Sequence, residues 1–306
     1  MTAQLIFLGV TTAGSQILRL FPEWADLLGL DAKIVGRDLP LAGPPEVYRR
    51  AVEELRDEPS VAGALVTTHK VAVQRYAGDL FSELDRWAWL CGEISCISKR
   101  DGRLIGHALD PITSGMAMSA IIAPGYWGER PGAGVLCMGA GGAGTAITAH
   151  LLAQPHRPGR IVITSRRPEP LEALRAIGQG LGGVEVLDPH MVASEEHTDA
   201  LLASMAPGSL VINATGAGKD RPGSPISGRV PFPEDAIAWD LNYRGDLGFL
   251  VQARRELPAS RIHDGWRYFI HGWTEVIGEV FGIEMAAERL AVLADAAEPF
   301  RPTTPT

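Results

Sequence analysis

The chain has 306 residues, a length for which two hydrophobic cores are expected. Its net charge is −8, and neither nucleic acid nor a membrane is expected as a partner because each requires a basic surface. Its cysteines are too few and too scattered for a disulfide framework or a metal site, and no metal is expected; they are Cys91, Cys96 and Cys137. The first residues lack a basic leader and no apolar run could span a bilayer, which together predict a cytoplasmic protein.

The first part of the chain alternates short apolar runs with stretches of helical periodicity. Strands are predicted over 5–9, 32–35 and 61–66, and helices over 17–28, 44–55 and 71–76. This alternation predicts a parallel α/β layer. Ligands gather at the carboxyl ends of strands in such a layer. Ser15 and Lys70 each lie just past one of these ends.

A hairpin is predicted next. The apolar stretches 91–98 and 104–110 flank Asp101-Gly102, and an Asp-Gly pair between two such runs is a strong hairpin signal. Pro111 then opens a helix over 112–122, which Pro124-Gly125 ends. This helix is the expected bridge into a second domain.

A glycine-rich turn is the most informative stretch of the chain. The apolar run 135–138 breaks at Gly139, and Gly141 and Gly144 complete a G-x-G-x-x-G pattern before an Ala-rich helix. Gly139 permits the tight turn, Gly141 lets N–H groups approach a pyrophosphate, and Gly144 lets the helix pack against the strand. Gly142 and Ala143 lie between them, at the positively polarised start of the helix.

The strand 160–164 ends in Ser165-Arg166-Arg167, about 20 residues beyond this turn, where a dinucleotide fold recognises the adenine-side ribose. An NAD site places a carboxylate there, whereas guanidinium groups suit a 2'-phosphate. We therefore predict NADP(H) as the cofactor. The alternative is that Arg166 and Arg167 form a solvated charge run.

The later strands of the second domain carry polar residues at their ends. A strand over 209–215 ends in Asn213 and Thr215, which are expected to line the nicotinamide side or, alternatively, only to cap the turn. A further strand over 236–241 leads to Tyr243. This tyrosine is either near the ligands or a structural aromatic residue.

Taken together, these motifs resemble the shikimate dehydrogenase family along nearly the whole chain. Five stretches in the family's order carry the resemblance: Val66-Thr67-Thr68-His69-Lys70, Gly106-His107-Ala108-Leu109-Asp110, Gly139 to Gly144, Thr164-Ser165-Arg166 and Val211-Ile212-Asn213-Ala214-Thr215. The resemblance implies an α/β fold with a substrate domain over 1–111, completed by 264–306, an NADP-binding Rossmann domain over 112–263, and a cleft between them. A homodimer is left open, since the sequence does not decide it.

The resemblance also implies site residues. Lys70 and Asp110 are the expected catalytic pair. The expected substrate-binding residues are Ser15, Thr67, Ser95, Tyr243 and His271, and the expected cofactor-binding residues are Gly139, Gly141, Gly142, Ala143, Gly144, Ser165, Arg166, Arg167, Asn213, Thr215 and Gly265.

Chemistry independently favours the Lys70–Asp110 pair. Hydride transfer to a carbonyl leaves an alkoxide that needs a proton donor. Lys70 would serve if burial lowers its pKa, while Asp110 orients the ammonium. The alternative is an ordinary surface ion pair. His69 is a further candidate acid or base, or a packing residue.

Several polar residues of the family pattern are replaced here. Ser15 keeps one of two serines expected to hold a carboxylate, but the other is Ile17. Further replacements stand at Leu65, Ser95, Ala108, Leu109 and Gly272. Because lost hydrogen-bond partners change specificity strongly, we expect a small polar carbocyclic substrate other than shikimate. The alternatives are a genuine shikimate or quinate dehydrogenase and a non-catalytic NADP or metabolite sensor.

Overall fold

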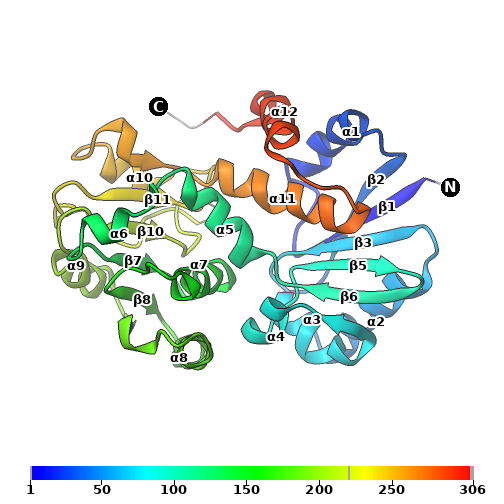
Figure 1. Ribbon diagram of the computed structural model, residues 1–306, viewed down its shortest axis with the longest axis horizontal. Helices are drawn as coiled ribbons and strands as arrows, with labels where there is room; N and C mark the ends of the chain where they lie inside the picture. The colour runs from blue at the N-terminus through cyan, green and yellow to red at the C-terminus, as the bar shows by residue number, and fades with distance from the viewer. Residues whose placement is uncertain (1, 220, 304–306) are drawn as a thin grey trace. The chain divides into compact units, whose positions relative to one another are not determined.

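Two six-stranded sheets organise the chain, one in each of two units (Figure 1). The structure is a computed structural model that describes residues 2–219 and 221–303. Unit 1 contains the residues up to Asp110 together with Ile270–Arg301, and unit 2 contains Pro111–Phe269. The chain therefore returns to unit 1 at Ile270 and not at residue 264, the boundary that the sequence indicated.

Unit 1 alternates strands and helices over its first three strands, as the sequence predicts. Before Asp110 its elements are β1 (Ala3–Gly9), α1 (Ile17–Leu28), β2 (Ala32–Asp38), α2 (Pro45–Asp57), β3 (Val61–Val66), α3 (Lys70–Ala77), β4 (Phe81–Leu84), α4 (Arg86–Cys91), β5 (Cys96–Arg100) and β6 (Arg103–His107). The returning chain adds most of α11 (Trp266–Phe281) and then α12 (Ala287–Ala297).

The sheet of unit 1 is mixed, with strand order β2-β1-β3-β5-β6-β4. β1 pairs in parallel with β2 and β3, whereas β5 is antiparallel to β3 and β6. The β5–β6 pair confirms the predicted hairpin. Asp101 and Gly102 at its tip have φ values of 50° and 75°, the positive values that a two-residue hairpin turn requires.

The stretch predicted as a single strand over 91–98 is different in the structure. Cys91 ends the helix α4, and the strand begins only at Cys96. The helix forms because the Asp85 side chain caps its first turn by accepting a hydrogen bond from the Ala88 N–H at 2.6 Å. The apolar composition of this stretch favours a strand, but the Asp85 cap stabilises a helix that extends into its first residue, Cys91.

Unit 2 is a doubly wound sheet whose strand pairs are all parallel. Its elements are α5 (Asp110–Ser119), which starts at the last residue of unit 1, α6 (Tyr126–Glu129), β7 (Val135–Met138), α7 (Gly142–Ala153), β8 (Ile161–Ser165), α8 (Pro168–Leu181), β9 (Leu187–Met191), α9 (Glu195–Ala203), β10 (Leu210–Asn213), β11 (Ile237–Asp240), α10 (Gly248–Ala253) and β12 (Ile262–His263). The strand order is β12-β11-β10-β7-β8-β9. The direction of winding reverses between β7 and β10, the place where such sheets bind ligands.

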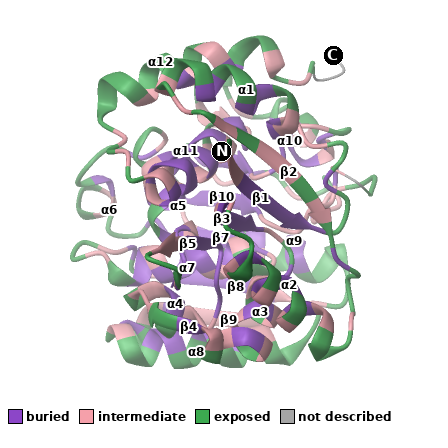
Figure 2. Cartoon of the chain, turned by 90° about the vertical axis from the view of Figure 1, so that its right-hand side faces the viewer, coloured by how far each residue is buried: buried purple, intermediate pink, exposed green. Residues whose placement is uncertain are grey.

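Each unit has its own apolar core. In unit 1 the core side chains come from β1, β3, β5 and β6 and the helices against them, and in unit 2 from β7, β8, β10 and β11. Figure 2 shows β1 as mostly buried and its neighbour β2 as a mixture of half-buried and exposed residues, which is the pattern of an edge strand. Within the described part of the chain, no helix has both the length and the apolar character needed to cross a bilayer.

Candidate active site

Lys70 and Asp110 form an ion pair in unit 1. Lys70 is the first residue of α3, just after β3, and Asp110 is the first residue of α5, just after β6. The Lys70 Nζ donates a hydrogen bond to Asp110 Oδ2. Only 15% of the Lys70 side chain and 17% of the Asp110 side chain are exposed. The fold therefore brings together two residues that are 40 positions apart and shields the pair from most of the solvent.

The surroundings of Lys70 keep its ammonium charged. Burial by itself would lower the pKa of Lys70, but the charges of Asp110 and Glu93 and the hydrogen bond to Asp110 outweigh burial, so the pKa is raised. The expectation that the pKa of Lys70 is lowered overall is therefore wrong, although burial acts in that direction. A charged lysine is suited to donating a proton and to stabilising negative charge on an oxygen atom.

Glu93 is a buried carboxyl group that the sequence analysis missed. The residue lies between the end of α4 and the start of β5 in the chain and is 2% exposed. Burial raises the pKa of Glu93 to about 7, with Lys70 acting against this rise and Asp110 adding to it. Its Oε1 has no hydrogen-bond partner among the described residues. The signal available in the sequence was a single acidic residue within the otherwise uncharged stretch 87–98.

Two of the predicted substrate-binding hydroxyls are used within the fold. Ser95 is buried, and its Oγ accepts a hydrogen bond from the Leu109 N–H at 2.9 Å, one residue before Asp110. Thr67 is half-buried and its Oγ1 donates to the carbonyl of Leu8 at 3.1 Å. The Ser95 hydroxyl thus fixes the backbone that leads to Asp110.

The remaining candidates of unit 1 differ in burial. Ser15 is half-buried in the turn after β1, where its N–H donates to the Thr12 carbonyl at 2.9 Å. His271 is buried in α11. His69 is also buried, with its ring 5.4 Å from that of Tyr48. These surroundings fit the packing role considered for His69.

The glycine turn of unit 2 has the geometry of a dinucleotide cradle. Gly139 has a φ of 107°, and a Cβ there would lie 2.9 Å from the carbonyl oxygen of Ala214 at the end of β10. A Cβ at Gly144 would collide with the carbonyl oxygen of Gly139. Gly141, the residue before α7, has open space beside it, and Gly142 is exposed. The N–H groups at the start of α7, from Gly142 through the half-buried Ala143 to Gly144, therefore fit the pyrophosphate of a dinucleotide.

The basic residues after β8 are exposed. Ser165 ends β8, and its Oγ accepts a hydrogen bond from the Arg167 N–H at 3.1 Å. In the described part of the chain, neither Arg166 nor Arg167 has an ion-pair partner within 4.0 Å. Two guanidinium groups that no carboxylate neutralises fit a phosphate on the ribose.

The polar residues at the end of β10 are occupied by the fold. The Asn213 amide donates to the Ala217 carbonyl at 3.1 Å and to Asp240 Oδ2 at 3.0 Å. Its Oδ1 accepts from the N–H of Thr215 at 3.1 Å and from the Thr215 hydroxyl at 2.7 Å. In this structure Asn213 and Thr215 therefore act as turn-capping residues, the alternative considered for them.

Tyr243 and Gly265 lie beside the start of α11. The Tyr243 ring packs against those of Trp266 and Phe269, with centroids 5.3 and 4.9 Å apart. A Cβ at Gly265 would collide with the backbone of Leu241, so this glycine allows the chain to pass close to the end of β11. Tyr243 therefore has a packing role in unit 2.

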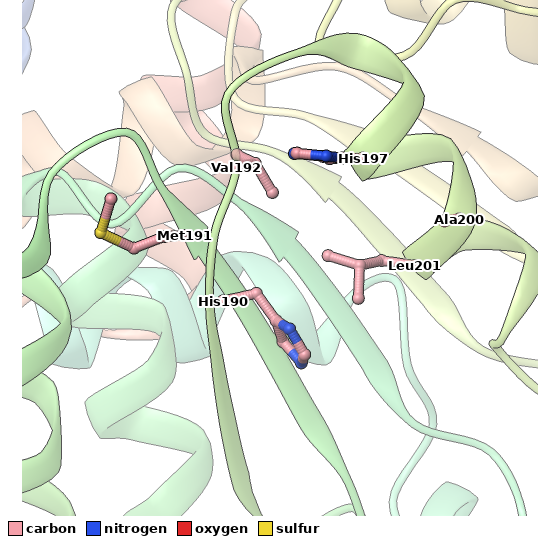
Figure 3. A pocket seen from close by; sticks show the side chains of 6 residues that line it. All are labelled: His190, Met191, Val192, His197, Ala200 and Leu201. Carbon is pink, nitrogen blue, oxygen red and sulfur yellow. The ribbon is translucent and has the colours of Figure 1, made fainter.

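A cavity of about 260 Å³ lies elsewhere in unit 2. Figure 3 shows its lining, which comes from the end of β9, the residue after it and α9: His190, Met191, Val192, His197, Ala200 and Leu201. His190 Nε2 lies 2.7 Å from Asp188 Oδ1 but makes no hydrogen bond among the described residues, whereas the Ala193 N–H donates to His197 Nδ1 at 3.3 Å. None of the residues predicted for the site lines this cavity. Among the described residues no cluster of three or more metal-ligating side chains is found.

No protein-family model matches the chain. A shikimate dehydrogenase (NADP(+)) from Salinibacter ruber is 31% identical over 207 residues, which is 65% of this chain and 66% of that protein. The chain belongs to the shikimate dehydrogenase-like family. Twelve curated proteins match it significantly, and another shikimate dehydrogenase (NADP(+)), from Thermococcus kodakarensis, is 26% identical over 75% of this chain and 74% of its own.

A solved structure of quinate dehydrogenase from Corynebacterium glutamicum in complex with NAD has the same fold as this shikimate dehydrogenase-like chain. The TM-score is 0.73 at 18% identity, over 96% of this chain and 98% of that one. This likeness confirms the predicted α/β fold class and the Rossmann-type architecture of unit 2.

Four departures of this shikimate dehydrogenase-like chain from the expected family pattern are apolar, buried residues. Ile17, in place of an expected serine, is 0% exposed in α1, and Ala108 is also 0% exposed. Leu65 and Leu109 are 9% and 8% exposed. These side chains pack in the core and offer no hydrogen-bonding group to a ligand.

Proposed function

We propose that the chain is an NADP(H)-dependent oxidoreductase that interconverts a secondary alcohol and a ketone on a small polar carbocycle. The observation that carries this proposal is the shielded Lys70–Asp110 ion pair, in a chain whose second unit has a glycine cradle for a dinucleotide. The names of the curated relatives, shikimate dehydrogenase (NADP(+)), support both the reaction and the cofactor. We further propose that unit 1 binds the substrate and that unit 2 binds the cofactor.

In this proposal the residues of unit 1 manage the proton. Bound NADP(H) supplies or accepts the hydride. When a ketone is reduced, Lys70 Nζ donates a proton to the oxygen that becomes negative, and Asp110 holds the ammonium in place. In the reverse direction Lys70 must first lose its proton. Because its pKa is raised, the charged state that suits reduction dominates at neutral pH.

The cofactor would be held by residues at the ends of β7 and β8. The N–H groups of Gly142 to Gly144 would bind the pyrophosphate at the start of α7. Arg166 and Arg167 would bind the 2'-phosphate through their guanidinium groups. Ser165 supports this loop through its hydrogen bond to the Arg167 N–H.

We propose that shikimate is not the preferred substrate. The buried apolar residues Ile17, Ala108 and Leu109 remove hydrogen-bonding groups that the family pattern would supply, and a site without a needed partner discriminates strongly. Steady-state assays with shikimate, quinate, aminoshikimate and cyclitols test this. Efficient turnover of shikimate or quinate would favour the alternative, a genuine shikimate or quinate dehydrogenase.

Replacement of Lys70 tests the reaction itself. Lys70→Ala removes the proton donor, and we expect turnover of the best of these probes to fall at least about a hundredfold while the Kd for NADP(H) stays nearly unchanged. Lys33→Ala on β2, where the lysine is exposed, is the control and should retain full activity. An unchanged rate in Lys70→Ala would refute the assignment of Lys70. Cofactor binding by the native protein without turnover of any probe would instead favour a metabolite sensor.

A further inference from the structure

Glu93 lies on a segment that is tied to both members of the Lys70–Asp110 pair. The N–H of Ile94, the next residue, donates to the Lys70 carbonyl at 3.1 Å. The hydroxyl of Ser95 accepts the Leu109 N–H at 2.9 Å, immediately before Asp110. One main-chain hydrogen bond and one hydrogen bond to the Ser95 hydroxyl thus hold the segment of Glu93 against the segments that carry Lys70 and Asp110.

One oxygen atom of the Glu93 carboxyl group is left without a hydrogen-bond partner among the described residues. Glu93 is 2% exposed, and this atom, Oε1, is itself buried. Buried carboxyl groups are normally satisfied, because an unpaired polar atom costs free energy. An unsatisfied one next to a candidate catalytic lysine therefore points to a role in the reaction.

Three titratable groups act on or respond to Glu93. Lys70 on α3 favours its ionised form, Asp110 on α5 disfavours it, and Cys91 at the end of α4 is neutral because burial raises the pKa of its thiol to about 12. The cation among these groups is Lys70. The ionisation of Glu93 and the proton affinity of Lys70 are therefore coupled, and the coupling acts equally in both directions.

We propose that Glu93 is a positioning residue of the active site, whose own protonation state controls how readily Lys70 gives up its proton. This proposal rests on the proposed function, in which Lys70 is the proton donor and acceptor. When Glu93 is neutral, Lys70 faces the single negative charge of Asp110. When Glu93 is ionised, a second negative charge stabilises the Lys70 ammonium and opposes the negative charge that develops on the substrate oxygen. Glu93 itself forms no bond to the substrate and transfers no proton to it.

The size of the effect follows from the charge. A neighbouring charge in a shielded site changes a pKa by about one unit. Ionisation of Glu93 should therefore change the fraction of neutral Lys70 about tenfold at a given pH. The pKa of Glu93, about 7, places this change near neutrality.

The direct test needs no substrate. The titration of Lys70 is followed in the full chain by NMR of lysines labelled with ¹³C at Cε, and the Lys70 signal is assigned by its absence in Lys70→Arg. In Glu93→Gln the Lys70 pKa should fall by about one unit. Glu83→Gln makes the same chemical change at an exposed residue of β4 and should leave the pKa of Lys70 unchanged. An unchanged Lys70 pKa in Glu93→Gln overturns the proposal.

Infrared spectroscopy checks the state of Glu93 itself. Asp240 in β11 is a second buried carboxyl group, whose pKa burial raises to about 7. The native chain should therefore show two protonated carboxyl groups that titrate near pH 7, and Glu93→Gln should remove one of them. If Glu93→Gln removes none, Glu93 is ionised throughout and the proposal fails.

Kinetics separate a positioning role from a structural one. In the oxidation of the fastest of shikimate, quinate and myo-inositol with NADP⁺, Lys70 must be neutral to accept the proton. Glu93→Gln should move the pH–rate profile about one unit toward acid and raise kcat about tenfold on its rising limb, with KM and the plateau unchanged. Glu93→Asp, which keeps the charge, should restore the native profile in part. A lower plateau without a shifted profile would show a structural role only.

The two proposals fail in different ways. If the proposed function is wrong, Lys70→Ala will turn over the substrate as fast as the native chain, whatever the role of Glu93. The NMR titration would still decide whether Glu93 controls the proton affinity of Lys70.

Discussion

Replacing Glu93 with glutamine should make the folded protein more stable at alkaline pH. Glutamine has nearly the same shape but no charge, and Oε1 of Glu93 has no hydrogen-bond partner among the described residues for the substitution to break. The folded-state pKa of Glu93 is raised to about 7 from a usual value of 4.5. Between these values the folded chain keeps a proton that the unfolded chain releases. The free energy of unfolding therefore falls as the pH rises through this window.

The magnitude follows from the shift in pKa. The difference of about 2.5 units corresponds to about 3 kcal/mol, at about 1.4 kcal/mol per unit. Glu93→Gln removes this pH dependence. The difference in the free energy of unfolding between the variant and the native chain should rise by about 3 kcal/mol from pH 4.5 to pH 8.5. Most of this rise should appear between pH 5 and pH 7.5.

Urea denaturation followed by circular dichroism at a series of pH values measures this gain. The raised pKa of Asp240 gives the native chain a pH dependence of the same sign, but it is present in both proteins and cancels in their difference. Glu83→Gln, at an exposed residue, should show no such trend. A stability difference between Glu93→Gln and the native chain that is constant from pH 4.5 to pH 8.5 would refute the reasoning.

Three further predictions concern the cofactor cradle and the packing of unit 1. Gly144→Ala places a methyl group against the Gly139 carbonyl oxygen and should weaken NADP(H) binding, measured by calorimetry, at least about tenfold. Gly141→Ala meets open space and should leave unit 2 folded. Equal thermal stability of the two variants would argue against the close approach of Gly144 to Gly139. Arg166→Ala should raise the KM for NADP⁺ about tenfold or more and leave that for NAD⁺ unchanged, and a parallel rise in both would exclude 2'-phosphate recognition. Trp24→Phe loses the hydrogen bond from Nε1 to a main-chain carbonyl of α12, 2.8 Å long, and should lower the free energy of unfolding by about 1–3 kcal/mol in urea; no loss would mean that this bond adds nothing net.

The glycine cradle and the catalytic pair could be predicted because their signals are local in the sequence. A buried strand, three glycines and a helix follow one another directly, so the turn around Gly139 needs no long-range information. Lys70 and Asp110 each stand just past a strand, and strand ends of one sheet meet at one edge.

The electrostatics of the site could not be predicted in the same way. The direction of the Lys70 pKa shift depends on the balance between burial and the interactions with Asp110 and Glu93, and this balance is set only by the tertiary fold. Likewise, Asn213 is a residue type that often binds ligands. In the structure its amide instead donates a hydrogen bond to Asp240 on the neighbouring strand. The number of charges around a buried group, and the partner of an amide, are decided by packing that no single stretch of sequence records.

Unit 1 is built from two segments that are separated in the chain, and this affects how it can fold during translation. The strands β1 to β6 are translated before unit 2, whereas α12, whose Leu293 carbonyl accepts the hydrogen bond from the Trp24 indole, is translated after it. Unit 2 is translated as one uninterrupted stretch. It can form its core before α12, which packs against α1, has been translated. Unit 1 therefore cannot complete its packing around Trp24 until the whole of unit 2 has been translated.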